Sequence, residues 1–289
     1  MHRSRKQRYA VFLYVLFIGI LALAGCQCHE AAVSVLDIEK LETESEQQVD
    51  DDPEENLFLI SQVSTVSEDA GTSKMENSMQ DYANKKLIAL TFDDGPNLVT
   101  TPDVLDVLER YEIPGTFFLI GRNITDDTQP VLERMVADGC EIASHAWSHQ
   151  QMNQLTAEEV IDEIQRTSDR IEALVGVRPV FFRPPYIAVN NTMYENIELP
   201  FICGTGCTDY DPAVTAQQRT ETILRTAQDG GIILLHDFTG NSQTVEALDG
   251  IIEGLLEEGY LFVTVSDLFR YKGIDPNQEY VLWNNVLQQ

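Results

Sequence analysis

The sequence predicts an α/β fold in which a largely parallel sheet closes into a small, incomplete barrel. From residue 85 onward, short apolar runs rich in β-branched and aromatic residues alternate with amphipathic helical stretches, as expected of βα units. Seven such runs lie between residues 85 and 271, which fits a barrel better than an open sheet. The acidic and histidine-containing motifs follow the ends of these runs, and α/β barrels assemble their sites at the carboxyl ends of their strands.

The expected strands and helices alternate along the domain, and two of the helices have recognisable starting signals. Thr101 followed by Pro102 suits the start of one helix, and Thr156 with Glu159 three residues later forms a capping box for another. The strands are expected at 87–92, 116–120, 141–144, 180–183, 201–207, 232–236 and 261–265. The helices are expected at 102–111, 128–138, 157–174, 216–229 and 244–258.

Residues 1–25 have the pattern of a secretion signal, namely a basic stretch, an apolar run over 9–24 and small residues before Cys26. Residues 23–26, Leu-Ala-Gly-Cys, resemble a bacterial lipobox, which implies cleavage before Cys26 and attachment of diacylglycerol to its sulfur. An uncleaved signal anchor is the alternative, because the apolar run is only a little shorter than the ~20 residues that span a membrane. Both interpretations predict a membrane as partner and place the domain on the extracytoplasmic face of the cell membrane.

Residues 26–84 are expected to form a disordered acidic linker. The stretch holds 15 acids against Lys40 and Lys74 and has no sustained apolar periodicity, so it cannot bury enough apolar surface to offset chain entropy. The folded domain is expected at 85–271, followed by a C-terminal tail at 272–289. The formal net charge of −28 argues against nucleic acid as a partner, because binding a polyphosphate needs a basic face.

The motif Thr-Phe-Asp-Asp-Gly-Pro at 91–96 ends the first buried strand at a sharp turn. Side chains alternate along extended backbone, so Asp93 and Asp94 cannot both point the same way. One carboxylate can therefore bind a metal while the other faces the reactant. The alternative is a pair of turn-forming acids, since Asp-Gly and Gly-Pro are ordinary turn signals.

The motif Ser-His-Ala-Trp-Ser-His at 144–149 places His145 and His149 four residues apart in a chain with five histidines. If this segment is helical, both imidazoles lie on one face and reach a single ion. Two imidazoles and one carboxylate leave open positions on a divalent metal, as a catalytic site requires. With Leu-Leu-His-Asp at 234–237, the three motifs suggest a hydrolase built around one metal ion.

These motifs, with Arg-Pro-Pro-Tyr at 183–186 and Thr-Asp-Tyr at 208–210, occur in an order that resembles the polysaccharide deacetylase (NodB homology) family, carbohydrate esterase family 4. The resemblance covers residues 85–270. It implies a deformed (β/α)7 barrel and a Zn²⁺ ion or another divalent cation such as Co²⁺, Ni²⁺ or Mn²⁺. The implied activity is hydrolysis of N-acetyl groups on β-1,4-linked amino sugars, or of O-acetyl groups in some members.

Carried over to this chain, the family pattern implies a metal site and a general base. The metal ligands would be Asp94, His145 and His149. Asp93 would be the general base, and Arg183 beside it would hold it ionised and in place.

The same pattern implies groups that stabilise the oxyanion and protonate the leaving group. The backbone N–H of Tyr186 would donate to the oxyanion. His236 would act as the general acid, and Asp209 would hold it in its protonated form. Leu234 and Tyr210 would line the pocket for the acetyl methyl group.

Two departures from the family pattern occur in these motifs. Ile187 stands where most members have Gly after Arg-Pro-Pro-Tyr, which puts the turn of the oxyanion loop in question. In the fourth motif, Gly206 replaces the first acid and Tyr210 replaces a Trp. Because Asp209 is retained, we expect an altered subsite shape more than lost chemistry.

The cysteines of the domain, Cys140, Cys203 and Cys207, are expected to be buried thiols. A bridge from Cys140 to one of the other two is the minority interpretation. If 201–207 is one strand, Cys203 and Cys207 stand about 13 Å apart at ~3.3 Å per residue, which is too far for a disulfide.

Three functions are compatible with the sequence. The favoured one is metal-dependent N-deacetylation of a cell-surface polysaccharide substrate such as peptidoglycan GlcNAc or a chitin-like oligomer. The second is an O-acetyl esterase acting on xylan or an exopolysaccharide. The third is a non-catalytic carbohydrate-binding protein, and the intact set of motif residues counts against it.

Overall fold

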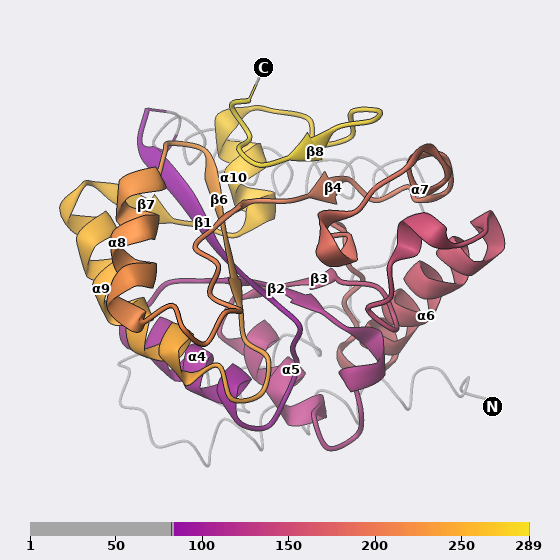
Figure 1. Ribbon diagram of the computed structural model, residues 1–289, viewed down its shortest axis with the longest axis horizontal. Helices are drawn as coiled ribbons and strands as arrows, with labels where there is room; N and C mark the ends of the chain where they lie inside the picture. The colour runs from indigo at the N-terminus through magenta and orange to yellow at the C-terminus, as the bar shows by residue number, and fades with distance from the viewer. Residues whose placement is uncertain (1–81, 83, 289) are drawn as a thin grey trace, which may run out of the picture. The chain divides into compact units, whose positions relative to one another are not determined.

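The structure, a computed structural model, describes residue 82 and residues 84–288 (Figure 1). The predicted signal peptide, the lipobox cysteine Cys26 and the acidic linker up to residue 81 lie outside the described residues. Within the described part of the chain, no helix has the length and apolar content needed to cross a membrane.

The described chain is built around a parallel sheet with the strand order β3, β2, β1, β6, β5, and β7 also pairs with β1. The central strand β1 is buried from its second residue to its last, as its apolar sequence predicts. Its carboxyl half pairs with β2 and its amino end pairs with β7. The strands of this sheet are β1 Lys86–Asp93, β2 Thr116–Leu119, β3 Glu141–Ser144, β5 Thr205–Gly206, β6 Gly231–His236 and β7 Tyr260–Phe262.

Phe182 continues the wall of strands, which forms a ring, beyond β3. It forms parallel bridges to Ser144 at the end of β3 and to Phe201 in β4, which spans Phe201–Ile202. Because β4 and β5 are successive pieces of one segment, and β5 pairs with β6, the ring returns to β1. The fold is therefore the expected deformed (β/α) barrel. The strand predicted at 180–183 is reduced to the one bridge at Phe182.

The strand predicted at 201–207 is broken into β4 and β5 at Gly204. This glycine has φ = 112°, in a region that residues with a side chain rarely adopt. A Cβ atom there would lie 2.9 Å from the carbonyl oxygen of Ile232, so close approach to β6 also requires glycine. The prediction of one continuous strand was therefore wrong, because the chain kinks at Gly204.

The segment 272–289, expected to be a tail, contributes to the barrel. Its strand β8, Leu282–Trp283, pairs in parallel with β4, and the Trp283 side chain is only 3% exposed. The backbone N–H of Cys203 donates to the Trp283 carbonyl, so this segment covers the edge where the ring is kinked. Two residues form too short a strand to stand out in a sequence pattern.

The helices form an outer layer whose order follows that of the strands. Contacts run from α8 to α9, from α9 to α4, from α4 to α5, from α5 to α6 and from α6 to α7 (Figure 1). Two short helices, α7 and α10, were not predicted; α10 begins at the end of the strand predicted at 261–265. The bounds are α4 Thr100–Arg110, α5 Gln129–Ala137, α6 Ala157–Val175, α7 Asn191–Asn196, α8 Ala216–Thr226, α9 Ser242–Glu257 and α10 Val265–Lys272.

Alternation along the strands divides the core in two and aims the chemistry inward. On β1, Ile88, Leu90 and Phe92 pack with residues of α4 and α9 under the helical layer. Leu87 and Ala89 instead pack with inward-facing residues of the other strands. The two-residue period of a strand therefore directs Asp93 to the inside of the barrel, at the carboxyl end of β1.

The three cysteines of the described domain are free thiols, as the sequence analysis preferred, but only one of them is fully buried. Cys207 is buried, while Cys140 and Cys203 are partly buried. Burial raises the pKa of Cys140 to about 11 and that of Cys207 to about 12, so both are protonated at neutral pH.

The helix starts agree with the sequence in one case and differ in the other. Helix α4 begins at Thr100 with Val99 as its N-cap, and the Asn97 side chain before it accepts a 2.7 Å hydrogen bond from the Thr100 N–H. The capping box of α6 is present as predicted: Thr156 accepts from the Glu159 N–H, and the Glu159 carboxylate accepts from the Thr156 N–H at 2.9 Å.

Replacing Thr156 with Ala is expected to destabilise the domain by about 1 kcal/mol, because loss of the hydroxyl leaves the Glu159 N–H in the first turn without its capping partner. Urea unfolding followed by circular dichroism would measure this loss. The Thr156→Ser variant keeps the hydroxyl and should unfold at the wild-type midpoint. An Ala variant as stable as the wild type would mean that water replaces the cap without cost.

Candidate active site

The turn after β1 holds two acids that face different partners. Asp93 is 2% exposed, and its Oδ1 lies 2.5 Å from Nη1 of Arg183. Asp94 has φ = 77°, which turns its side chain away from the direction that strand alternation would give. Its Oδ1 lies 3.2 Å from Nε2 of His149 and 3.6 Å from Nε2 of His145. The two carboxylates have different nearest partners, but both approach Nε2 of His145, since Oδ2 of Asp93 lies 3.8 Å from that atom. The expectation that they point in different directions was wrong because it assumed extended backbone at Asp94.

His145 and His149 converge through a loop and not through a helix. The segment 145–149 follows β3 without helical structure, and both Ala146 (φ = 64°) and His149 (φ = 59°) have left-handed backbone. The two imidazole rings have centroids 4.9 Å apart. The helical interpretation of the four-residue spacing was therefore wrong, although the convergence of the two side chains that it predicted is present.

The residues Asp94, His145 and His149 offer ligand atoms that lie within 4.8 Å of one another. Nδ1 of His145 lies 2.7 Å from the carbonyl oxygen of Arg183. Because a carbonyl only accepts, Nδ1 carries the proton and Nε2 presents a lone pair towards Asp94. Oδ1 of Asp94 is buried and has no hydrogen-bond partner among the residues that the structure describes. A lone pair and an unpartnered carboxylate oxygen facing one point fit a divalent cation.

Glu163, which the sequence analysis missed, holds the loop between the two histidines. Its carboxylate accepts from the Trp147 N–H at 2.9 Å, from the Ser148 N–H at 2.8 Å and from the Ser148 hydroxyl at 2.8 Å. It is 5% exposed and shares the buried face of α6 with Val160, Thr167 and Ile171. A carboxylate inside an apolar stripe is the sequence signal that could have found it.

Asp237, the last residue of the 234–237 motif, braces the turn after β1. Its backbone N–H donates to the carbonyl of Asp93, and its buried carboxylate accepts from the Thr101 hydroxyl. A Cβ atom on Gly95 would lie 2.6 Å from Oδ2 of Asp237, so the glycine of the 91–96 motif is required by this contact. Burial raises the pKa of Asp237 to about 7.

Arg183 is completely buried beside Asp93. Its guanidinium carbon lies 3.9 Å from the centre of the Phe118 ring, so the ring face and the Asp93 carboxylate both compensate its charge. This contact confirms the expected geometry of the pair. The register of β1 against β6 also places Asp93 directly opposite His236.

His236 pairs with Asp209 as expected. Nδ1 of His236 lies 2.8 Å from Oδ1 of Asp209, and the His236 backbone N–H donates to Oδ2 at 2.8 Å. Burial by itself lowers the pKa of His236, but the hydrogen bond to Asp209 and the charges of Asp93, Asp209 and Asp94 outweigh it and raise the pKa to about 9. Burial raises the pKa of Asp209, and its hydrogen bonds to His236 and Thr244 reverse the direction and lower it.

The remaining predicted residues surround these groups. Tyr186 has φ = 59° and is largely exposed, and its ring meets that of His149 edge to face with centroids 4.8 Å apart. Tyr210 is also exposed, and its ring meets that of His236 at 5.8 Å. Leu234 lies in β6 beside β5, two residues before His236, on the same side of the strand.

The two departures in the motifs have structural consequences. Ile187 keeps a left-handed backbone, with φ = 55°, where glycine would be unstrained. The turn therefore forms with a β-branched residue at a strained position. Gly206 lies against β6, where a Cβ atom would be 3.1 Å from the Leu234 carbonyl oxygen. Glycine in place of the acid therefore allows β5 to pack closely on β6.

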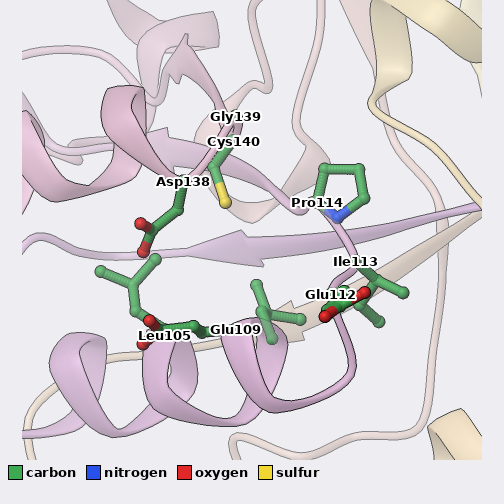
Figure 2. A pocket seen from close by; sticks show the side chains of 9 residues that line it. Leu105, Glu109, Glu112, Ile113, Pro114, Asp138, Gly139 and Cys140 are labelled. Carbon is green, nitrogen blue, oxygen red and sulfur yellow. The ribbon is translucent and has the colours of Figure 1, made fainter. Parts of the chain in front are cut away.

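A hollow of about 760 Å³ adjoins two of the three candidate ligand residues. It is lined by Asp94 and His149 together with the exposed apolar residues Leu98 and Val99 and the cation Arg122. A different pocket, of about 460 Å³, lies at the amino ends of β2 and β3, and Cys140 and Pro114 line it (Figure 2). Only the first of these two lies at the carboxyl ends that carry the motif residues.

Comparison with known proteins identifies related sequences over most of the described chain. The profile described as polysaccharide deacetylase matches residues 80–199. A bifunctional xylanase/deacetylase of Pseudobutyrivibrio xylanivorans is 53% identical over 210 residues, which are 73% of this chain and 35% of that protein. A peptidoglycan-N-acetylglucosamine deacetylase of Bacillus cereus is 36% identical over 196 residues, which are 65% of this chain and 91% of that protein.

Two solved structures have the same fold. The Xyl-CE4 domain of a multidomain xylanase from the hindgut metagenome of Trinervitermes trinervoides is 56% identical, with a TM-score of 0.70 over 71% of this chain and 100% of that chain. A family 4 acetyl xylan esterase from Clostridium thermocellum in complex with a cobalt ion is 39% identical, with a TM-score of 0.69 over 70% of this chain and 100% of that chain. The chain spans about a third of the length of the Pseudobutyrivibrio protein.

Proposed function

The chain belongs to the polysaccharide deacetylase family, and on that premise we propose that it removes acetyl groups from a polysaccharide by metal-dependent hydrolysis. One observation carries the proposal. Around the carboxyl ends of β1, β3 and β6, a three-residue metal-binding cluster lies beside a carboxylate paired with arginine and near an imidazole paired with aspartate. These are the groups that acyl hydrolysis needs, namely a base, an acid and a site for a cation.

Asp94, His145 and His149 would hold the ion. When bound, a divalent cation would polarise the acetyl carbonyl and lower the pKa of the attacking water. Two imidazoles and one carboxylate suit Zn²⁺ and also Co²⁺, Ni²⁺ or Mn²⁺. Reconstitution of the metal-free protein with each ion in turn would identify the one that supports the highest activity.

Asp93 would take the proton from the attacking water. Its Oδ1 is engaged by Arg183, while Oδ2 lies 3.8 Å from Nε2 of His145 and faces the cluster. Pro184 and Pro185 have no N–H, so Tyr186 supplies the first backbone donor after Arg183. Its N–H would donate to the oxyanion as negative charge develops on the acetyl oxygen.

His236 would donate the proton that the leaving group requires. Because Nδ1 donates to Asp209, the proton available to the substrate is the one on Nε2. The Asp209 carboxylate stabilises the imidazolium, so the acid is ready before the substrate arrives. After transfer, neutral His236 must regain a proton, and Asp93 must release the proton that it took from the attacking water, directly or through solvent, to complete the cycle.

The pH dependence follows from the raised pKa of His236. Because its folded-state pKa is about 9 against 6.5 when unperturbed, the protonated acid predominates below pH 9, and kcat/KM is expected to fall as pH rises through about 9. By linkage, the interaction contributes stability that is fully present below pH 6.5 and is lost as pH rises through 9. Replacing Asp209 with Asn should move the alkaline limb of kcat/KM towards 6.5. An unmoved limb would mean that another group sets it.

Two classes of acetylated polymer are supported by different observations. The protonated imidazole of His236 suits a poor leaving group such as the amine of an N-acetyl sugar, as in the peptidoglycan GlcNAc favoured by the sequence analysis. The xylan-associated relatives, however, are 53% and 56% identical to this chain, against 36% for the peptidoglycan deacetylase from Bacillus cereus. That difference favours O-acetyl groups of xylan as the second candidate.

An acetate-release assay separates the two candidates and tests the proposal as a whole. The full chain would be incubated with GlcNAc oligomers, peptidoglycan and acetylated xylan, each with and without a chelator. Release from the first two supports an N-deacetylase, and release from xylan alone supports an O-acetyl esterase. Binding to a polymer without acetate release from any substrate, with metal bound, would favour the non-catalytic alternative.

The location outside the cytoplasm is also a proposal. It rests on the lipobox resemblance at residues 23–26 and on the basic and apolar stretches before it. Metabolic labelling with a fatty acid would mark a lipoprotein, and the Cys26→Ser variant should lose the label. A labelled Cys26→Ser variant would exclude Cys26 as the site of lipid attachment, and an unlabelled wild type in the membrane fraction would indicate the uncleaved anchor.

A further inference from the structure

A second buried arginine is linked through Thr244 to Asp209, the partner of His236. Arg219, on α8, is 1% exposed, and it does not contact a carboxylate among the described residues. Its Nη1 donates to Oδ1 of Asn241 and to Oγ1 of Thr244, both at 2.7 Å. Its Nε donates to the Val214 carbonyl at 2.9 Å. The guanidinium therefore satisfies its charge with neutral oxygen atoms.

The direction of these hydrogen bonds is fixed because a guanidinium can only donate. The Thr244 oxygen accepts from Arg219, so its single proton points to Oδ2 of Asp209, which lies 2.8 Å away. Asn241 accepts through Oδ1, which leaves its Nδ2 to donate to the His236 carbonyl at 2.8 Å and to Oδ2 of Asp209 at 3.4 Å. Arg219 thus determines that two neighbours present protons, and not lone pairs, to Asp209.

We propose that Arg219 is a positioning residue for His236: by orienting Thr244 and Asn241 as donors, it holds Asp209 in the orientation in which its Oδ1 accepts from Nδ1 of His236. The proposal rests on the acid role of His236 in the proposed function. All members of the network are buried: Arg219, Asp209, Thr244 and Asn241 are each at most 5% exposed.

The two buried arginines act in different ways for a physical reason. Arg183 contacts Asp93 directly, which stabilises the ionised form of a base. An arginine in direct contact with Asp209 would compete with His236 for that carboxylate and would repel the imidazolium. Placing a hydroxyl and an amide between Arg219 and Asp209 supplies hydrogen-bond donors while leaving the carboxylate charge to His236.

The charged groups that act on His236 are few. Asp209 contacts it directly, and Asp93 and Asp94 act from the end of β1. The neighbouring rings are those of Tyr210 and Phe238. Near Asp209, the Cys207 thiol has a pKa raised to about 12 by burial and is neutral over the working range. A change in the hydrogen-bond donors to Asp209 is therefore expected to change the pKa of His236.

The test replaces Thr244 with Val, which removes one donor to Asp209 and leaves the bonds of Arg219 to Asn241 and Val214 in place. The pKa of His236 is measured directly by NMR titration of ¹³C-labelled histidine in the metal-loaded full chain, with its signal assigned from the His236→Gln variant. We expect the pKa to fall, because Asp209 loses one of the donors that hold it while its Oδ1 accepts from Nδ1 of His236. The alkaline limb of kcat/KM should fall equally.

Three further variants make the result specific. Arg219→Lys keeps a cation but cannot hold both acceptors in one planar fork, so it should lower the His236 pKa in the same direction. Thr244→Ser keeps the donor and should restore the wild-type value. Thr220→Val removes another hydroxyl between α8 and α9, one that bonds to the Ala216 and Ala247 carbonyls, and should leave the His236 pKa unchanged.

Failure of the positioning role of Arg219 can be told apart from failure of the proposed function. A His236 pKa that stays at the wild-type value in Thr244→Val overturns the positioning role, whether or not Arg219→Lys folds. A shift that also occurs in Thr220→Val would indicate general loosening of the helix pair and would overturn it too. If the pKa falls as expected but no acetylated polymer is hydrolysed, the proposed function fails while the network is upheld.

Discussion

Replacing Asp94 with Asn is expected to remove bound metal and acetate release together. Oδ1 of Asp94 is the atom on which the two histidine Nε2 atoms converge, at 3.2 and 3.6 Å. An amide oxygen is uncharged and binds a divalent cation far more weakly than a carboxylate does. Asn also tolerates the φ of 77° at this position, so the backbone should be preserved. Metal affinity should fall by more than ~100-fold, because Asp94 is a direct ligand and loss of an outer partner already costs up to that much.

His149→Asn should have the same effect, since His149 supplies a second ligand from another left-handed position. Metal content by elemental analysis and acetate release would be measured on the same samples, with circular dichroism to establish folding. The matched control is Asp127→Ala, which removes an exposed carboxylate from the same hollow. Full activity in a folded Asp94→Asn protein that holds no metal would refute the ligand assignment. Loss of metal in Asp127→Ala would indicate a different ligand set.

Replacing Asp93 with Asn is expected to leave the metal bound while lowering kcat by about 10² to 10⁴-fold, which is the usual contribution of a general base. The amide cannot take a proton at neutral pH, but its oxygen can still accept from Nη1 of Arg183. Asp93 is not among the three residues whose ligand atoms cluster, so metal affinity should change little. Metal binding and kcat measured together therefore separate this variant from Asp94→Asn.

The stability of Asp93→Asn adds a second readout. Arg183 is fully buried, and its Nε and Nη2 have no hydrogen-bond partner among the described residues. Removing the charge of Asp93 leaves a buried cation with less compensation, which costs up to about 3 to 5 kcal/mol. Urea unfolding should show this loss. A variant with wild-type kcat would mean that another group takes the proton, and a variant that loses the metal would place Asp93 among the ligands.

The strands and the motif positions were predictable because they depend on local pattern. The apolar run of β1 ends at Asp93, and that of β6 ends at His236, so parallel pairing had to bring both side chains to one edge of the sheet. The capping box at Thr156 was also predictable, because its two partners lie three residues apart. Such features need only neighbouring residues and the periodicity of a strand or helix.

Features that need contacts distant in sequence were missed or misread. The convergence of His145 and His149 was argued for the case that 145–149 is helical, because spacing alone cannot show that Glu163 fixes this segment as a loop through several hydrogen bonds. The break of the strand at Gly204 depends on the approach of β6, and β8 becomes a strand only by pairing with β4. None of these partners is adjacent in the chain.

Local chemistry alone was therefore enough to indicate an α/β barrel, a cation site and the residue types of a hydrolase. Long-range packing decided the rest: which atom of His145 carries its proton, how Ile187 adopts a strained turn, and how Arg219 reaches Asp209 through Thr244 and Asn241. The physical reason is that a side chain's direction follows from its own backbone. The protonation state and hydrogen-bond direction of a buried group depend instead on whichever partners the fold brings to it.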